Sequence, residues 1–399
     1  GEVLGRPHLL LDAALNRMTL ASTPAEALLL EHVNLNIPHA SLELARQFYI
    51  DALGGALNPR STNERQLHVN IGASQLHLPH RLSVQIGEPC VTPQIWCGAI
   101  TLCTSEPLAE VFRRVDALHM RETAGGEEAN RQWARPTLFA PANGTPRLLC
   151  TCPWGNNYDI VSTPVGFVPA GEHPGGSHGL QAMLRVSHHV RKGAAAQLQS
   201  FWAEILNCVA DLDEVPVSGG VLGQASSAAR CTIRFATGQE LVFVEADAEN
   251  APPANAYDTD EAAGYHLALY LPTHAAFEAA FRRAEAAGLL FENPRFVGGP
   301  IEFASAMTWE EADDAAQFRI KDLGQSGGIR TAMRTRTCDS VGGVESQARL
   351  TAPLGEDRVA EAALVLELEV RSPSHVSCPL DSAAVAARRE RDLMRRERG

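Results

Sequence analysis

The sequence predicts an α+β fold in which four βαβββ modules pair to form two domains, each a curved sheet shaped like half of a barrel. Three observations predict this fold. A strand, a helix and further strands follow one another in the same order four times along the chain. FYIDALGG at 48–55 matches FWAEILNC at 201–208, with an aromatic pair and a leucine in register. The length of 399 residues suggests two or three domains and exceeds what a single small core requires.

The first module opens with a strand over 31–37, EHVNLNI, in which polar and apolar residues alternate. This alternation places His32 and the two asparagines on one face of the strand. A helix over 41–53 follows, because apolar residues recur there at the spacing of one helical face. Short strands are then expected near 56–58, 66–71 and 74–78, with Gly72 in the last turn.

The three later modules repeat this order. The second has a strand at 98–103, a helix at 107–118 and strands near 136–140, 146–151 and 157–162. The third has a strand at 180–186, a helix at about 194–206 and strands at 231–236 and 240–245. The fourth has a strand at 265–271, a helix at 275–287 and a last strand at 364–370.

A single module makes a curled half-sheet that cannot cover its own inner face, so the modules are expected to pair. Adjacent modules pair, or the first pairs with the fourth; the sequence leaves both arrangements open. Along the chain we expect an N-terminal extension, a first paired domain, a linker, a second paired domain with a polar insertion, and a charged C-terminal helix. Their ranges are 1–30, 31–165, 166–179, 180–380 with the insertion at 324–362, and 381–399.

Composition narrows the function classes. Asp and Glu total 47 against 34 Lys and Arg, and this net charge of −13 argues against a nucleic-acid partner. No run of 18 apolar residues suggests a membrane-spanning helix. The nine cysteines are odd in number and form no CxxC pair, which favours reduced thiols in the cytoplasm or an organelle stroma. The chain begins with Gly1, so its N-terminus is open to processing, and we expect a monomer or a homodimer.

Three segments carry a resemblance to a known family: EHVNLNIPHASLELARQFYIDALGG at 31–55, PWGNNYDI at 153–160 and YHLALYLP at 265–272. In these segments and in its module order, the chain resembles the vicinal-oxygen-chelate superfamily. That superfamily includes glyoxalase I, the extradiol dioxygenases and the fosfomycin and bleomycin resistance proteins. The resemblance implies metal ligands on the first strand of a module and at an inward position of its last strand.

When the ligand positions of the superfamily are carried over to this sequence one at a time, the resemblance implies five candidate metal ligands: His32, His77, Asp159, His266 and Glu367. Two imidazoles and a carboxylate suit a divalent metal such as Fe, Zn, Ni or Mn. If the first module pairs with the fourth, His32 and His77 face His266 and Glu367. Glu369 takes the inward place of Glu367 if the last strand slips by two residues.

At other ligand positions of the superfamily the chain carries residues that remove an expected ligand: Gly98, Gln181 and Phe243. His68 is a candidate for a second-shell residue or a catalytic base. We expect His188 and His189 to lie in an exposed loop after their strand. The resemblance implies a glyoxalase- or dioxygenase-like enzyme that acts on a small oxygen-rich substrate through Lewis-acid catalysis. The alternative is a metal-free protein that binds or sequesters a small molecule on the same fold.

Overall fold

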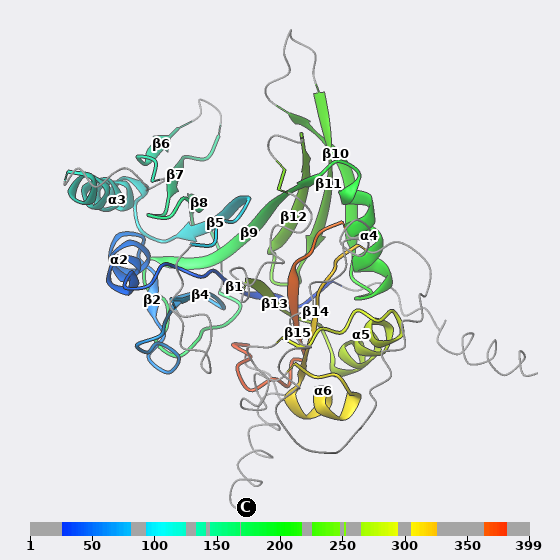
Figure 1. Cartoon of the computed structure of the whole chain (residues 1–399). Coiled ribbons are helices and arrows are strands. Elements are labelled where there is room, and N and C mark those ends of the chain that lie inside the picture. The colour runs from blue at the N-terminus through cyan, green and yellow to red at the C-terminus, as the bar shows by residue number, and fades with distance from the viewer. Residues whose placement is uncertain are drawn as a thin grey trace, which may run out of the picture.

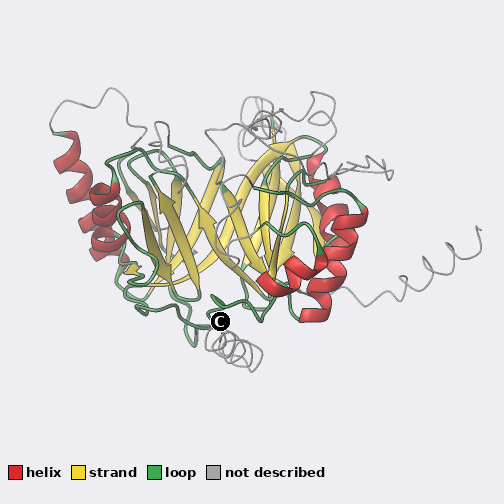
Figure 2. Ribbon diagram, turned by 60° about the horizontal axis from the view of Figure 1, so that its bottom comes forward, coloured by secondary structure: helices red, strands yellow, loops and turns green. Residues whose placement is uncertain are grey.

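In a computed structural model of the chain, two curved β-sheets lie side by side, and helices stand at both ends of the pair (Figure 1, Figure 2). The structure describes residues 26–80, 93–124, 133–140, 144–167, 169–217, 226–247, 251–252, 265–293, 305–324 and 363–380. Most of the expected N-terminal extension and polar insertion, and the whole of the expected C-terminal helix, lie outside these residues.

One sheet has seven strands in the order β14-β15-β13-β1-β4-β3-β2. Its strands come from the first and fourth modules. They are β1 (Leu29–Asn34), β2 (Ala56–Leu57), β3 (Gln66–Ile71), β4 (Ser74–Pro79), β13 (His266–Tyr270), β14 (Gln317–Ile320) and β15 (Glu367–Arg371).

The other sheet has eight strands in the order β10-β11-β12-β9-β5-β8-β7-β6. Its strands come from the second and third modules. They are β5 (Gly98–Thr104), β6 (Thr137–Phe139), β7 (Arg147–Thr151), β8 (Asn157–Ser162), β9 (Leu180–Arg191), β10 (Ala210–Val217), β11 (Ser226–Arg234) and β12 (Glu240–Ala246).

Each sheet therefore joins modules from opposite halves of the chain. β1 pairs antiparallel with β13, and β5 pairs antiparallel with β9. This is the first-with-fourth arrangement, one of the two that the sequence leaves open. The contiguous ranges 31–165 and 180–380 consequently do not coincide with the two sheets, because each range supplies strands to both.

The helices cover the outer faces of the sheets with apolar side chains. The expected helix over 41–53 is present as α2 (Leu42–Arg46) followed by a π-helical turn, η1 (Gln47–Ala52), which buries Phe48 and Tyr49. The remaining helices are α3 (Leu108–Thr123), α4 (Ala194–Glu204), α5 (His274–Ala286) and α6 (Trp309–Ala315). The sequence prediction did not include α6, β10 and β14.

β9 is longer than predicted and continues to Arg191. Because burial alternates along it, His188 takes an inner position with no exposed surface, and its ring meets that of Trp96 edge-on at 4.6 Å between centroids. The expectation of an exposed loop at His188 was therefore wrong. Val186, His188 and Val190 are all buried, so the alternation of the strand continues past the histidine pair.

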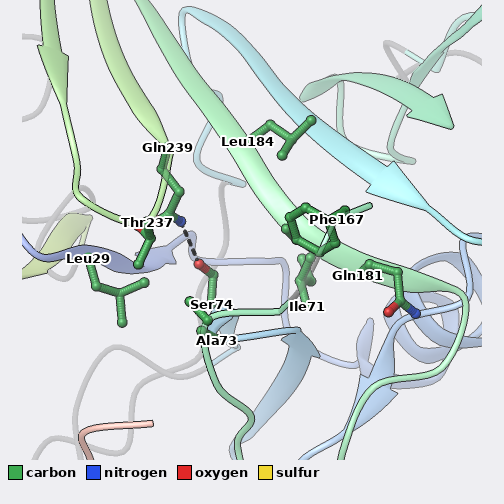
Figure 3. A pocket seen from close by; sticks show the side chains of 11 residues that line it. Leu29, Ile71, Ala73, Ser74, Phe167, Gln181, Leu184, Thr237 and Gln239 are labelled. Carbon is green, nitrogen blue, oxygen red and sulfur yellow. Dashed lines mark hydrogen bonds between the residues drawn. The ribbon is translucent and has the colours of Figure 1, made fainter. Parts of the chain in front are cut away.

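Gln239 ties the two sheets together. Its side-chain nitrogen is hydrogen-bonded to the carbonyl oxygen of Leu30 at 2.9 Å, the hydroxyl of Ser74 at 2.8 Å and the carbonyl oxygen of Met183 at 3.0 Å. The backbone N–H of Leu30 donates to the side-chain oxygen of Gln239 at 3.0 Å. A small pocket lies beside this contact, and Figure 3 shows the Gln239–Ser74 bond at its wall.

The turn between β3 and β4 reaches β9 at the same junction. Gly72 has a φ of +64°, and a Cβ built on it would overlap the carbonyl oxygen of Gln181. The predicted turn is confirmed, and only glycine satisfies both its left-handed backbone and the close approach of the second sheet.

Candidate metal centre

Four neighbouring strands of the seven-stranded sheet each contribute one histidine to the same region. From β3 to β13 these are His68, His77, His32 and His266. The ring of His77 is stacked on those of both His68 and His32, with 3.8 Å between centroids in each pair. His266 meets His32 edge-on at 5.0 Å. We call these four residues the histidine row.

Imidazole nitrogens and carboxylates converge at one end of the histidine row. Nε2 of His32 lies 2.9 Å from Nε2 of His266, and a carboxylate oxygen of Glu369 lies 3.6 Å from the same atom of His266. Possible ligand atoms of these three residues lie within 4.8 Å of one another. The same holds for Glu31, His32 and His77. Two or three imidazoles with a carboxylate are a donor set that divalent transition metals use, so these residues fit such an ion.

The structure brings together His32, His77 and His266 among the predicted ligands. Glu367 lies beside His266 in the register of β15 against β13, but its carboxylate is bound by Arg319 and accepts a hydrogen bond from Asn293 at 2.8 Å. Glu369 has its carboxylate next to His266 instead. The two glutamates share one face of β15, because side chains two residues apart in a strand point the same way.

Asp159 does not lie in this cluster. It is on β8 of the eight-stranded sheet, where Arg147 donates to its carboxylate at 2.8 Å and Thr101 donates at 3.3 Å. The other ligand positions expected in this sheet carry Gly98 on β5, Gln181 on β9 and Phe243 on β12. Gly98 and Phe243 have no side chain that binds metal, and the amide nitrogen of Gln181 donates to the carbonyl oxygen of His178 at 2.6 Å. The candidate donors therefore come from the first and fourth modules.

Two buried arginines neutralise the carboxylates of the cluster. Arg319 binds both Glu367 and Glu369, and its side chain is 2% exposed. Arg371 binds Glu369 and also Glu31, the latter at 2.9 Å. Burial alone would raise the pKa of Glu369, but the two guanidinium groups outweigh burial and hold this pKa well below its usual value. Glu369 is therefore charged and held in place at neutral pH.

Burial raises the pKa of a carboxyl group but lowers that of an imidazole, because it disfavours the charged form of each. It lowers the pKa of His68 to about 3 and that of His77 well below 6.5, with the neighbouring His32 adding to both shifts. A neutral imidazole keeps a nitrogen lone pair, which is the form that binds a metal or accepts a hydrogen bond.

His68 stands at the far end of the histidine row and is 7% exposed. Within the described part of the chain, neither of its ring nitrogens has a hydrogen-bond partner. A buried polar group without a partner costs about 1–3 kcal/mol, so a molecule that supplies one gains affinity at this position. His68 is thus the polar group of the row that is best placed to meet a ligand.

Sequence reasoning did not single out Glu31, Arg319 or Arg371. The sequence does contain a pattern that could have indicated Arg319 and Arg371. β14 and β15 carry polar residues at every second position within fully buried strands. An alternating polar face in a buried strand indicates an internal ion-pair network or a site. Glu31 has no such signal, because simple alternation places it on the face opposite His32.

No protein-family model matches the chain, and no curated protein matches it. Among solved structures, a mutant of glyoxalase I from Zea mays is 11% identical with a TM-score of 0.39, over 67% of this chain and 84% of that one. 2,2′,3-Trihydroxybiphenyl 1,2-dioxygenase from Sphingomonas wittichii is 13% identical with a TM-score of 0.24, over 67% and 82%. A glyoxalase-related enzyme from Fulvimarina pelagi is 21% identical with a TM-score of 0.25, over 39% and 99%.

The chain itself has the module order expected from its sequence: a strand, a helix and further strands, repeated four times and paired into two open curved sheets. Among the described residues, no helix is long and apolar enough to cross a membrane.

Proposed function

We propose that this protein is a metal-dependent enzyme acting on a small oxygen-rich molecule at the inner face of the seven-stranded sheet. One observation carries the proposal: the Nε2 atoms of His32 and His266 face each other at 2.9 Å, beside the carboxylate of Glu369 and the ring of His77. Facing imidazole nitrogens need a shared proton or a cation between them, and a divalent metal supplies that cation.

In this proposal His32, His266 and Glu369 would hold the metal, which is Fe, Zn, Ni or Mn, and the ring of His77 stacks on that of His32 beside it. When bound, such an ion acts as a Lewis acid on substrate oxygens. The chain's own residues orient the reactants. Arg319 and Arg371 fix the carboxylates, and His68 offers a neutral imidazole that donates or accepts a hydrogen bond at a substrate oxygen.

The cellular setting follows from the same reasoning. No cysteine in the described part of the chain forms a disulfide, which supports a reducing compartment such as the cytoplasm or an organelle stroma. The expected partner is a small-molecule substrate, and the protein acts as a monomer or a homodimer.

Elemental analysis of the purified protein tests the proposal. We expect about one equivalent of a divalent transition metal, lost in His266→Ala and retained in Asp159→Asn. The second variant is the matched control, because Asp159 is an equally predicted ligand that lies in the other sheet. Absence of metal in the wild-type protein, before and after incubation with each candidate ion, would reject the proposal.

A metal-free binding protein is the second candidate, and the arginines favour it. Each carboxylate of the cluster already has a guanidinium partner, so the described side chains balance most of their charge without an ion. This candidate predicts that binding of a small ligand is the same with and without a chelator. Ligand binding that disappears with EDTA and returns with added metal would exclude it.

A further inference from the structure

The strand that carries His32 is irregular at the residue before it. β1 pairs with β13 in a register that places Leu30 opposite Leu269 and His32 opposite Ala268, so Glu31 is an extra residue on β1. An extra residue of this kind forms a β-bulge, which redirects side chains and is common beside functional sites. The bulge explains how two consecutive residues, Glu31 and His32, reach the same cluster.

Glu31 is 1% exposed, and its carboxylate contacts His32, Arg371 and His173. One carboxylate oxygen is bound to Nδ1 of His32 and to Arg371, the latter at 2.9 Å. The other lies 3.4 Å from Nε2 of His173, which the segment between the two halves of the chain supplies. A guanidinium and two imidazoles therefore surround the Glu31 carboxylate, which acts as a hydrogen-bond acceptor in this cluster.

We propose that Glu31 is a positioning residue for His32: it accepts the Nδ1 proton of His32 and thereby leaves the Nε2 lone pair directed at His266. This inference rests on the proposed metal site. A carboxylate on one ring nitrogen fixes the tautomer and the orientation of a metal-binding histidine and makes its other nitrogen more basic. Arg371 extends the arrangement, because it binds Glu31 behind His32 and Glu369 beside His266. One guanidinium thus aligns donors from the first and the fourth module.

The geometry separates this role from direct ligation by Glu31. The carboxylate of Glu31 occupies the Nδ1 edge of His32, while His266 faces the Nε2 edge of the same ring. A metal held between His32 and His266 therefore lies at the edge of the imidazole away from Glu31. The carboxylate of Glu369, which contacts His266, is the one on the metal side.

Cobalt(II) binding to the full chain tests the inference, measured by competition with a chelator and by visible absorption. We expect Glu31→Gln to weaken cobalt affinity by about 10- to 100-fold, the usual effect of losing an outer carboxylate, while leaving the shape of the cobalt spectrum unchanged. Glu31→Asp should recover part of the affinity. His173→Gln is the matched control, because it removes a different contact of the same carboxylate and should leave cobalt affinity unchanged.

A second measurement needs neither metal nor activity. Long-range ¹H–¹⁵N spectra of the metal-free protein, with His32 assigned through His32→Gln, should show the ring proton on Nδ1. Wild-type cobalt affinity in Glu31→Gln, a spectrum showing a lost ligand, or a proton on Nε2 would each overturn the inference. If the wild-type protein binds no metal, the proposed function fails, while the Nδ1 proton still decides whether Glu31 orients His32. The wild-type spectrum also answers the question if Glu31→Gln does not fold.

Discussion

Replacing Arg319 by methionine should expose how strongly the carboxylates of the cluster depend on their arginines. Arg319 is 2% exposed and binds Glu367 and Glu369, which are 5% and 2% exposed. After its removal, Glu369 keeps Arg371, and among the described residues Glu367 keeps the hydrogen bond from Asn293 alone. Removing one partner of a buried ion pair costs about 3–5 kcal/mol, because a charge remains in the interior without compensation. Since one of the two carboxylates keeps an arginine, we expect a loss of about 3 kcal/mol.

The assay is urea unfolding at pH 7 in the presence of EDTA, with Glu367→Gln as the partner variant. The double variant Arg319→Met/Glu367→Gln removes the arginine together with the charge that loses most from its absence. It should recover about 2 kcal/mol relative to Arg319→Met, the size of coupling seen between contacting residues. A loss below about 1 kcal/mol in Arg319→Met, or no recovery in the double variant, would refute the reasoning, because exposed pairs behave in that way.

Three further predictions concern residues outside the candidate centre. His188 has its pKa lowered from 6.5 to about 3 by burial, so the unfolded chain takes up a proton as the pH falls below 6.5 and the folded chain does not. The free energy of unfolding should therefore decrease by up to about 1.4 kcal/mol for each unit by which the pH falls in this window. His188→Gln should show a shallower dependence of the urea midpoint on pH between pH 7 and 5, and parallel profiles for the two proteins would contradict this. Gly72→Ala should lower the melting temperature, because it strains a left-handed turn and clashes with Gln181, whereas Gly238→Ala, where a Cβ meets nothing, should cost less. Gln239→Leu should lower the free energy of unfolding in urea by about 1–3 kcal/mol, because it leaves buried backbone groups of Leu30 and Met183 without this partner. A loss below about 0.5 kcal/mol, as surface substitutions give, would show that the contact between the sheets does not depend on Gln239.

Most strands and most helices were predictable because their signals are local. The sequence pattern identified β3, β4, β8 and β13 to within one residue at each end, and β1 to within three. The apolar stripe of the helix at 41–53 matched the buried residues of α2 and η1. Gly72 was predictable as a turn because a left-handed backbone favours glycine in any surrounding. The elements that sequence missed are short or lie beside segments of irregular composition, as β14 and α6 do.

The site was only partly predictable, because two of its determinants are not local. Which modules pair depends on contacts between strands at opposite ends of the chain, and alternation within a strand carries no information on them. Asp159 therefore appeared equivalent to Glu367, although the two lie in different sheets. The bulge at Glu31 is the second determinant. It exists only relative to the register of β13, so the sequence of β1 alone places Glu31 on the wrong face.

The cross-chain pairing gives the two sheets unequal chemistry, although they have the same plan. Joining the first module to the fourth places His32 and His77 next to His266 and Glu369, and encloses five buried charged groups that need one another. Joining the second to the third places Gly98 and Phe243 at the corresponding positions and leaves Asp159 to a half-exposed arginine. Buried charge networks cost more to assemble than an apolar face, and such networks are commonly found where a site requires fixed donors. The seven-stranded sheet has such a network and the eight-stranded sheet has a half-exposed pair at Asp159, which supports the proposal that the first and fourth modules form the functional pair.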